Sequence, residues 1–507
     1  MLKKIRCLLA AMVFIGITLL FLDFTGTFHV WLGWLAKIQF LPAVMALNAV
    51  VIVSLVILTL VFGRIYCSVI CPLGIMQDLL ARLHRKKNKY SYSTELRWLR
   101  YPLLVVFIMA AVVGVGEFVQ LLAPYSSYGR MATMLLQPLW MLGNNALAFL
   151  AERADSYAFY GIEVWTKSLP VFVIALVTLT ILAILTWRGG RTYCNTICPV
   201  GTLLSLLARY SWLKIRFKAG KCHNCTLCTK NCKAACIDYK THSVDYSRCV
   251  VCGNCIANCK FGALAYTASA GKNRESGKTE EAGHSRKQES TTGSNMPTSQ
   301  SKRSFLIATT MVAAAAMAQK KDKIMDGGLA ELEHKVAPER QTPLTPPGAL
   351  SFDNLSKRCT GCQLCVSKCP NNVLRPSTDL LHLMQPTMSY EHGYCRPECT
   401  LCSEVCPAGA IQPIDSDKKS SIQIGHAVFI KKNCVAVNDG VECGNCARHC
   451  PSGAIEMVPL DTDDEEGPYV PAINEQACIG CGACEYVCPA RPFSAIMVEG
   501  HEVHHNI

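Results

Sequence analysis

Cysteines at short and regular intervals are the residues of this sequence best suited to chemistry. Four groups of four cysteines lie near the C-terminus, and a proline follows each group. The groups are Cys359, Cys362, Cys365 and Cys369; Cys395, Cys399, Cys402 and Cys406; Cys434, Cys443, Cys446 and Cys450; and Cys478, Cys481, Cys484 and Cys488. The first and fourth have the C-x-x-C-x-x-C-x-x-x-C-P spacing that holds [4Fe-4S] clusters. The second and third only widen the first gap.

Two further groups precede these and have the same spacing without the proline. They are Cys222, Cys225, Cys228 and Cys232, and Cys249, Cys252, Cys255 and Cys259. Lys233 and Lys260 stand where the proline is usual, and Cys236 is an additional cysteine that could replace Cys232 as a ligand. The sequence therefore predicts about six [4Fe-4S] clusters.

The ligands of paired clusters are expected to cross between neighbouring groups. In two-cluster sites the last cysteine of each run ligates the cluster of the other run. The predicted sets are Cys222, Cys225, Cys228 and Cys259; Cys249, Cys252, Cys255 and Cys232; Cys359, Cys362, Cys365 and Cys406; Cys395, Cys399, Cys402 and Cys369; Cys434, Cys443, Cys446 and Cys488; and Cys478, Cys481, Cys484 and Cys450. Crossed ligation holds the clusters of a pair close together, which suits electron transfer.

Disulfides and zinc are the other ways to use 30 cysteines in 507 residues. Disulfide frameworks suit small chains that lack a core, and zinc sites often include histidine at a different spacing. Neither pattern matches. The sequence also has no dinucleotide-binding glycine fingerprint and no P-loop. Its net charge of +13 does not favour nucleic acid, because the basic residues flank apolar runs as in membrane proteins.

Four more cysteines form two matched pairs, Cys67 with Cys71 and Cys194 with Cys198. Residues 63–82 and 190–209 are identical at twelve of twenty positions and share the motif Y-C-x-x-x-C-P-x-G. We favour a cofactor-binding role for these pairs, as a redox dithiol or as a metal or cluster site shared by the two halves. The alternative is a structural role, in which the thiols stabilise the turn after each span.

The elements that position these motifs include four apolar runs, at residues 7–25, 41–62, 101–123 and 169–187. Each is long enough to cross a hydrocarbon layer of about 30 Å. Basic residues gather at the N-terminus, in residues 63–100 and after 188, and cytoplasmic loops carry such an excess. None of the runs contains histidine, which excludes a membrane haem held by two histidines.

We therefore predict a membrane α-helical protein with four spans in two repeats, one internal signal or anchor span, and α+β ferredoxin-like cluster domains. The expected parts are a membrane domain at 1–219, a cytoplasmic two-cluster domain at 220–266, a disordered linker at 267–304, an export signal or anchor at 305–318 and a periplasmic four-cluster domain at 345–500. The linker is polar and of low complexity. Lys302 and Arg303 precede a short apolar run, as in twin-arginine export signals.

These motifs resemble two known families. Residues 1–265 are similar to NapH, the polytopic quinol-dehydrogenase subunit of periplasmic nitrate reductase systems, in their apolar runs, both Y-C-x-x-x-C-P-x-G motifs and two cluster motifs. Residues 301–495 are similar to NapG and MauM ferredoxins in their export signal and four cluster motifs. The resemblance implies a fusion of both modules that oxidises quinol in the bacterial inner membrane and delivers electrons to a periplasmic acceptor.

We expect an electron-transfer subunit that connects the membrane quinone pool to a periplasmic respiratory reductase or redox carrier, with no nucleic-acid partner. The alternative is an assembly or maturation factor that reduces a metal centre of a partner enzyme. Asp23, His29 and Glu117 lie near the outer ends of predicted spans and are candidates for accepting quinol protons. Their other interpretation is as ordinary interfacial polar residues.

Overall fold

The computed structural model describes residues 2–23, 26–83, 90–218, 220–268, 324–325, 331–461 and 467–507. Met1–Thr267 and Lys323–Ile507 group into one unit, and Ala268–Asp322 form a second. The predicted linker, beyond its first two residues, and the predicted export signal lie outside the described residues.

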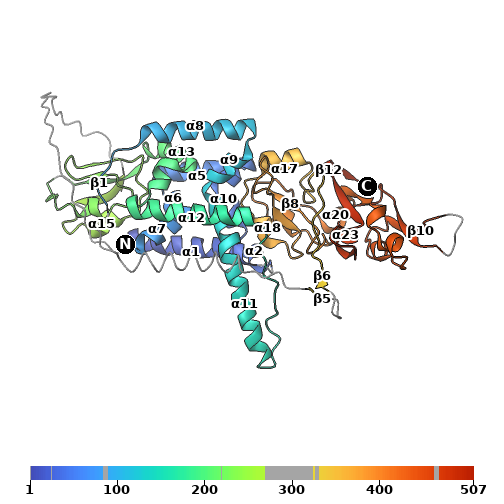
Figure 1. Ribbon diagram of the computed structural model, residues 1–507. Coiled ribbons are helices and arrows are strands. Elements are labelled where there is room, and N and C mark those ends of the chain that lie inside the picture. Colours follow the sequence, from blue (N-terminus) through green and yellow to red (C-terminus); the bar gives the residue numbers. More distant parts are fainter. Residues whose placement is uncertain are drawn as a thin grey trace, which may run out of the picture. The chain divides into compact units, whose positions relative to one another are not determined.

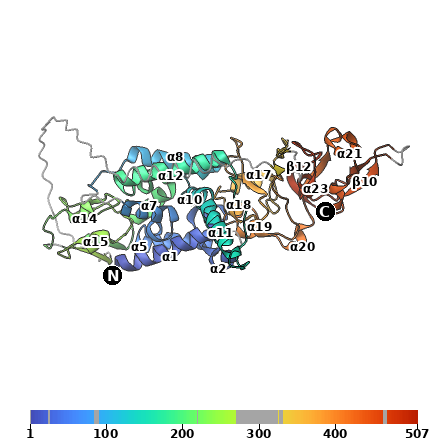
Figure 2. The same cartoon turned by 60° about the horizontal axis from the view of Figure 1, so that its bottom comes forward.

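The N-terminal part is a bundle of helices, in which the axes of α1, α8 and α12 are roughly parallel (Figure 1, Figure 2). Its helices are α1 (Leu2–Leu22), α2 (Thr27–Leu32), α3 (Trp34–Lys37), α4 (Phe40–Met45), α5 (Ala49–Phe62), α6 (Tyr66–Val69), α7 (Pro72–Leu83), α8 (Arg97–Val113), α9 (Gly116–Leu122), α10 (Pro124–Met131), α11 (Gln137–Glu152), α12 (Leu169–Gly189) and α13 (Pro199–Ala208). The bundle also contains two π-helical turns, η1 (Ala132–Leu136) between α10 and α11 and η2 (Tyr193–Ile197) between α12 and α13. Such turns occur often at functional sites.

Two of the predicted spans are continuous helices. Helices α1 and α12 have 21 residues each, and among the described residues these two are long and apolar enough to cross a membrane. The predicted run at 41–62 is instead divided into α4 and α5, because Leu47 has a φ of 53° and Asn48 caps α5 by accepting from the Val51 N–H. The run at 101–123 is divided at Gly114, whose φ of 91° ends α8.

The predicted outer loop at 124–168 is largely helical. Helix α10 begins at Pro124, every one of its residues is buried, and it contacts α7 and α12 inside the bundle. Helix α11 then leaves the bundle (Figure 1). A helix can be buried in this way because its backbone groups pair within the helix.

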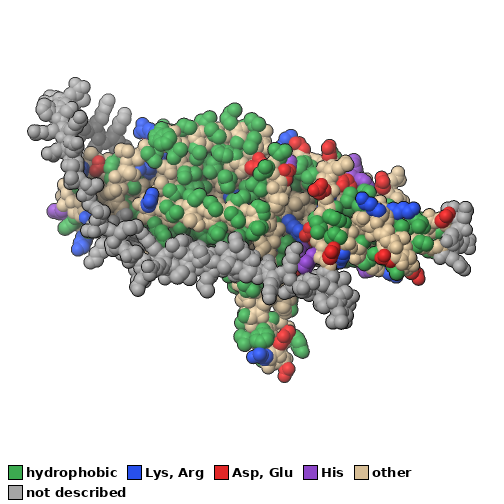
Figure 3. Space-filling model, in the orientation of Figure 1, with side chains coloured by type: hydrophobic (Ala, Val, Ile, Leu, Met, Phe, Trp, Pro, Cys, Tyr) green, Lys and Arg blue, Asp and Glu red, His purple; other side chains and the backbone are tan. Residues whose placement is uncertain are grey.

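The surface of the bundle is rich in apolar side chains (Figure 3). Val105, Val112 and Val177 are 58%, 79% and 49% exposed. Apolar surfaces of this extent mark contact with a membrane or a partner.

A small α+β region follows the bundle. It contains β1 (Leu213–Phe217), α14 (Leu227–Lys230), β2 (Ile237–Asp238), β3 (Ser243–Val244), α15 (Asn254–Asn258) and β4 (Leu264–Ala268). Strand β1 pairs with β4, and β2 pairs with β3. Its core combines Ile215, Ile237 and Leu264 with buried cysteines.

The C-terminal region is also α+β. Its strands are β5 (Ile324–Met325), β6 (Glu331–Leu332), β7 (Leu374–Pro376), β8 (Pro386–Met388), β9 (Ile422–Phe429), β10 (Ile455–Pro459), β11 (Tyr469–Ile473) and β12 (Ile496–Asn506). Its helices are α17 (Phe352–Arg358), α18 (Leu364–Lys368), α19 (Leu401–Val405), α20 (Ser416–Lys419), α21 (Val435–Asn438), α22 (Asn445–Arg448) and α23 (Ala483–Val487), with one 3-10 turn, η3 (Lys431–Asn433). Pairs β5–β6, β7–β8, β9–β12 and β10–β11 are two-stranded sheets.

This region extends past the predicted limits of 345 and 500. Strand β12 continues to Asn506, so His501, His504 and His505 lie in this strand. His504 Nε2 lies 2.8 Å from Thr345 Oγ1. Before residue 345, Arg340 forms a buried ion pair with Glu485 at 2.6 Å.

Candidate cluster sites

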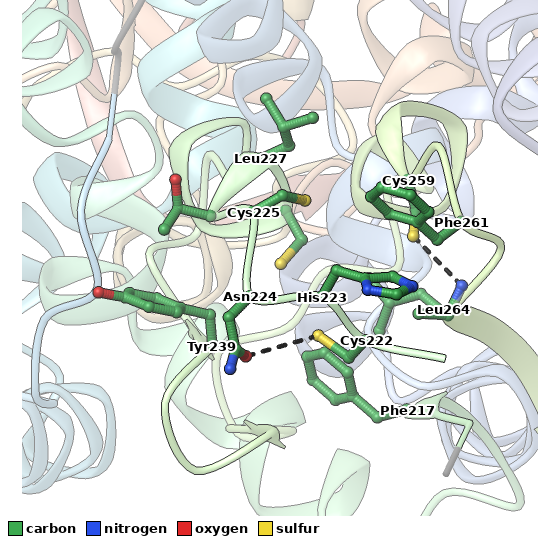
Figure 4. Close-up of a pocket in the computed structure, with 13 residues that line it drawn as sticks. Phe217, Cys222, His223, Asn224, Cys225, Leu227, Tyr239, Cys259, Phe261 and Leu264 are labelled. Carbon is green, nitrogen blue, oxygen red and sulfur yellow. Dashed lines mark hydrogen bonds between the residues drawn. The ribbon is translucent and has the colours of Figure 1, made fainter. Parts of the chain in front are cut away.

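One predicted ligand set lines a cavity in the small α+β region (Figure 4). Cys222, Cys225, Cys228 and Cys259 surround a space of about 350 Å³. Cys222 and Cys225 come from the loop that leads into α14, Cys228 lies within α14, and Cys259 follows α15. The Cys259 sulfur accepts a hydrogen bond from the Ala263 N–H at 3.2 Å.

Three further cavities, of about 350, 400 and 270 Å³, lie in the C-terminal region. Each is lined by three cysteines of one run and the last cysteine of another run. They hold Cys395, Cys399, Cys402 and Cys369; Cys434, Cys443, Cys446 and Cys488; and Cys478, Cys481, Cys484 and Cys450. These are the combinations that crossed ligation predicts.

The two remaining sets are also brought together. The Cys365 thiol interacts electrostatically with Cys362, Cys359 and Cys406, which places the crossed partner beside the first run of the C-terminal region. We call this run, Cys359 to Cys369, the first outer run, after its predicted side of the membrane. In the small α+β region, Cys255 has the same relation to its crossed set of Cys252, Cys249 and Cys232.

The additional cysteine, Cys236, lies within this last set. Its sulfur is 3.5 Å from that of Cys232, and its side chain is 1% exposed. Both thiols are therefore placed to act as the fourth ligand.

These sites fit an iron–sulfur cluster better than a single ion. Among the described residues, no three His, Cys, Asp or Glu side chains gather closely enough to hold one metal ion, as zinc would require. The cavities are lined mainly by thiols and apolar side chains, and four thiols are the donor set of a bulkier iron–sulfur core. Backbone N–H groups of Gly361 and Ala495 donate to the sulfurs of Cys359 and Cys488 at 3.4 and 3.3 Å. Such hydrogen bonds stabilise cluster thiolates.

The two matched cysteine pairs converge inside the bundle. Cys67, Cys71, Cys194 and Cys198 are 4%, 4%, 2% and 3% exposed. The Cys198 thiol interacts electrostatically with the other three. The two repeats thus place four thiols in one buried site, which we call the four-thiol site.

Two arginines tie the repeats together at this site. Arg64 Nη2 donates to the Cys194 carbonyl at 3.0 Å, and Arg191 Nη1 donates to the Cys67 carbonyl at 2.6 Å. Each repeat therefore contributes an arginine to the cysteine of the other, in a reciprocal arrangement.

The glycine of each motif permits this close approach. A Cβ at Gly74 would lie 2.2 Å from the Cys67 carbonyl oxygen, and a Cβ at Gly201 would lie 2.3 Å from that of Cys194. No side chain fits at these distances, so the motif requires glycine there.

Asp78 links the four-thiol site to the small α+β region. Its carboxylate pairs with Arg6 at 3.0 Å, Arg191 at 2.9 Å and Lys233 at 3.3 Å. Burial alone would raise the pKa of Asp78, but the positive charges of Arg191 and Lys233 hold it well below its ordinary value. The carboxylate therefore stays ionised and holds four chain segments together.

The first outer cysteine run packs against the other end of the bundle. Ser126 Oγ donates to the Thr360 carbonyl at 2.5 Å, and Gln137 Nε2 donates to the Ser367 carbonyl at 2.9 Å. Lys167 Nζ donates to the Val366 carbonyl at 2.6 Å. The loop that carries Cys362 and Cys365 is thus attached to the bundle by side chains of α10, α11 and the segment before α12.

The three candidate proton acceptors have different surroundings. Asp23 forms a buried ion pair with Lys368 at 2.5 Å and accepts from the Gly26 and Phe28 N–H groups, so its carboxylate is used structurally. Burial lowers the pKa of His29, and the positive charges of Lys368 and Lys37 lower it further.

His29 has the features of a proton acceptor at neutral pH, because it is neutral and its Nδ1 is buried without a hydrogen-bond partner among the described residues. Glu117 lies in the first turn of α9 and is partly exposed.

The cysteine motifs alone did not predict three of the site residues, which are Arg64, Arg191 and Asp78. The first two could have been found, because Gly-Arg stands three residues before the first cysteine of both motifs. Asp78 has Ser205 at the matching position of the second repeat, so the repeat carries no signal for it.

Comparisons with known proteins agree with the cysteine sites. Residues 44–90 and 170–220 match a family described as 4Fe-4S binding domain. Two families described as 4Fe-4S dicluster domain match residues 358–410 with 441–491, and residues 245–373. The four-thiol site lies within the first match, and most of the other cysteine groups lie within the last two.

Three curated relatives are ferredoxin-type proteins. The methylamine utilization protein MauM of Methylobacillus flagellatus is 32% identical over 165 residues, which are 32% of this chain and 70% of MauM. NapH of Escherichia coli is 27% identical over 235 residues, 45% of this chain and 69% of NapH. The methylamine utilization protein MauN of Methylobacillus flagellatus is 25% identical over 216 residues, 41% of this chain and 64% of MauN. No solved structure matches the chain.

Proposed function

Because the chain belongs to the ferredoxin-type proteins that include MauM, we propose that it carries electrons from membrane quinol to a reductase or redox carrier on the periplasmic side of a bacterial inner membrane. Its 4Fe-4S domains and relatives identify an iron–sulfur electron-transport protein. Iron–sulfur clusters supply one-electron redox chemistry. Quinol as donor, the periplasmic acceptor and the membrane topology are the proposed parts.

The observation that carries this proposal is the attachment of the first outer cysteine run to the bundle. Ser126 and Gln137 hold the backbone on both sides of Cys362 and Cys365, and Lys368 is paired with Asp23 of α1. A cluster held by this run would lie at the end of the bundle. A quinol dissolved in the hydrocarbon can approach that end, so electrons can enter the outer domain there.

The ligands that we propose are the six crossed sets. Five depend on the last cysteine of a neighbouring run, and these cysteines lie in the cavities or thiol groups described above. The sixth uses Cys232 or Cys236. Crossed ligation joins consecutive runs, so each pair of clusters is held by one folded unit and the pairs form a series.

We propose four membrane passages, two of them by broken helices. The exposed apolar surface of the bundle supports this placement, and broken helices are stable in a membrane where protein surrounds the break. The basic residues support a cytoplasmic N-terminus and cytoplasmic residues 188–300, and the predicted export signal or anchor at 305–318 supports a periplasmic location for residues 320–507.

The proposed reaction balances with one-electron carriers. Oxidation of one quinol to quinone releases two electrons and two protons. The electrons leave one at a time through the cysteine-held centres, and the acceptor takes up both. The protons pass to water at the outer face, where His29 is placed to accept one.

The test is reduction of the clusters by quinol in membranes that contain the full chain. Addition of a reduced menaquinol analogue under anaerobic conditions should produce the electron paramagnetic resonance (EPR) signals of reduced clusters. Cys362→Ser should abolish this reduction, because it removes a ligand of the cluster nearest the bundle, while dithionite should still reduce the remaining clusters.

Cys446→Ser is the matched control. It removes a ligand far along the series and should leave quinol reduction of the first outer cluster unchanged. If quinol reduces no cluster in the parent protein, although dithionite reduces them all, the proposed donor is wrong.

A further inference from the structure

The four-thiol site belongs to none of the six ferredoxin sets. Its cysteines are all buried, and their thiols interact with one another across the two repeats. Four thiols without histidine or carboxylate are the donor set of an iron–sulfur cluster. They do not gather closely enough to hold one metal ion.

The charges around the site call for an anionic group. Arg64 is fully buried, and its partners are the Asn195 amide oxygen, backbone carbonyls and the Cys67 sulfur, with no carboxylate. Asp78 is shared by three cations. Buried cations without counter-charge destabilise a fold strongly. An oxidised iron–sulfur core with four thiolates carries a net charge of about −2, which would balance them.

Two buried hydrogen-bond donors also lack partners. Arg64 Nε and Arg191 Nη2 donate to no atom among the described residues. Buried donors in this state are rare in native proteins and call for an explanation, such as an absent ligand. Cluster sulfides and thiolates accept hydrogen bonds, so a cluster between the two arginines would pair them.

The second cysteine of each pair precedes a helix and accepts a backbone hydrogen bond there. Cys198 precedes α13, and its sulfur accepts from the Gly201 N–H at 3.3 Å. Cys71 stands in the same relation to Gly74 at the start of α7. The N-terminus of a helix favours negative charge and stabilises thiolates.

One side of the four-thiol site adjoins the small α+β region. The Arg191 N–H donates to the Lys233 carbonyl at 2.8 Å, and Asn195 Nδ2 donates to the Ala234 carbonyl at 3.3 Å. These carbonyls follow Cys232 directly in the chain. The segment that follows Cys232 is therefore in direct contact with the segment that carries Cys194.

The other side approaches the first outer cysteine run. The Tyr66 phenol interacts electrostatically with Cys71, and Tyr125 of α10 interacts with both Tyr66 and Cys362. Helix α10 is buried in the bundle and brings Tyr125 between the two sites. Two tyrosines thus connect the four-thiol site to the ligands of the first outer cluster.

We propose that Cys67, Cys71, Cys194 and Cys198 together hold one iron–sulfur cluster between the two repeats, and that this cluster passes electrons between the inner and outer ferredoxin clusters. The first part is independent of the donor and acceptor. The second part rests on the proposed topology. One electron moves at each step, from a reduced centre to an oxidised one, and no bond is made or broken.

The first test is the metal content and spectrum of the full-length protein, purified anaerobically. The Cys71→Ser, Cys198→Ser double variant should lose about two to four iron atoms per chain, the content of one cluster. Its Mössbauer spectrum should lack one component, whose parameters distinguish [2Fe-2S] from [4Fe-4S]. Cys7→Ser, which changes a bundle cysteine outside the site, should retain all the iron.

Several results would overturn the cluster. The iron content and spectrum of the double variant could equal those of the parent. Mass spectrometry of the parent under non-reducing conditions could find peptides linked by Cys67, Cys71, Cys194 or Cys198 disulfides. The parent protein could also contain stoichiometric zinc that is lost in the double variant, in which case the site holds zinc and not an iron–sulfur cluster.

A second variant keeps the test valid if the double variant does not fold. Arg64→Gln removes one positive charge, so the midpoint potential of a single EPR signal should shift to more negative values. Arg64→Lys should shift it less. A protein in which neither change alters any midpoint potential holds no cluster at this site.

The relay is tested with sealed right-side-out vesicles that contain dithionite-reduced protein. Ferricyanide, which does not cross the membrane, should oxidise outer and inner clusters in the parent. In the double variant, oxidation of the inner clusters should slow at least tenfold, while the outer clusters react as before. Equal rates would exclude the relay. Because no quinol is added, this outcome does not depend on the proposed donor.

Discussion

Replacement of Asp78 by asparagine tests how the bundle is held together. The carboxylate pairs with Arg6 on α1, Arg191 before η2 and Lys233 in the small α+β region, at 3.0, 2.9 and 3.3 Å. All four residues are at most 8% exposed. Asparagine keeps the shape of the side chain but removes the charge, so three buried cations lose their shared counter-charge.

The expected loss follows from the burial of this network. Removal of one partner of a buried ion pair costs about 3–5 kcal/mol. At about 2–4 °C per kcal/mol, the melting temperature should fall by about 6–20 °C. Thermal denaturation of the purified full-length protein, followed by circular dichroism, measures this. Lys233→Met in the Asp78→Asn background should recover part of the loss, because it removes one unpaired cation.

Asp353→Asn is the control for this experiment. Asp353 pairs with Lys357 at 2.7 Å, but both side chains are more than 60% exposed, and such pairs contribute about 0–1 kcal/mol. If Asp78→Asn changes stability as little as this control, the inference that buried charge holds the bundle to the small α+β region is wrong.

Three further predictions concern cluster ligands and one buried histidine. Cys406→Ser should alter the EPR signal of the cluster held by the first outer run, whereas uncrossed ligation would alter that of the second. Cys232→Ser and Cys236→Ser should each retain both inner clusters, and only the double variant should lose one, because their sulfurs are 3.5 Å apart. Burial lowers the pKa of His504 to about 4, so between about pH 6.5 and 4 the unfolded chain binds a proton that the folded chain does not. Stability should therefore fall by up to about 3 kcal/mol as pH decreases through this range, and His504→Asn, but not His505→Asn, should flatten the dependence in thermal denaturation.

The sequence by itself identified the iron–sulfur chemistry. Each run contributes three ligands within about ten residues, and this local spacing depends on the backbone between them rather than on distant packing. The crossed fourth ligand could be predicted because consecutive runs of this type pair regularly. The sequence did not show whether Cys232 or Cys236 is the fourth ligand, because the two cysteines are only four positions apart.

The composition of the apolar runs did not show which of them form unbroken helices. The runs at 41–62 and 101–123 are apolar throughout their length, yet Leu47 and Gly114 adopt positive φ values and divide them. Burial of α10 was likewise invisible in the sequence, because its polar residues find partners only inside the bundle. Arg130, for example, is fully buried and donates to the Gln120 carbonyl at 2.7 Å.

Only the tertiary structure decided what surrounds the two matched cysteine pairs. The sequence showed that the pairs are related, but left open a dithiol, a shared centre or a structural turn. Arg64 and the Cys194 carbonyl are 130 positions apart, and Arg191 and the Cys67 carbonyl are 124 apart. No local propensity encodes contacts at that separation. They arise because the two similar repeats pack against each other, which brings four thiols and two buried arginines into one site.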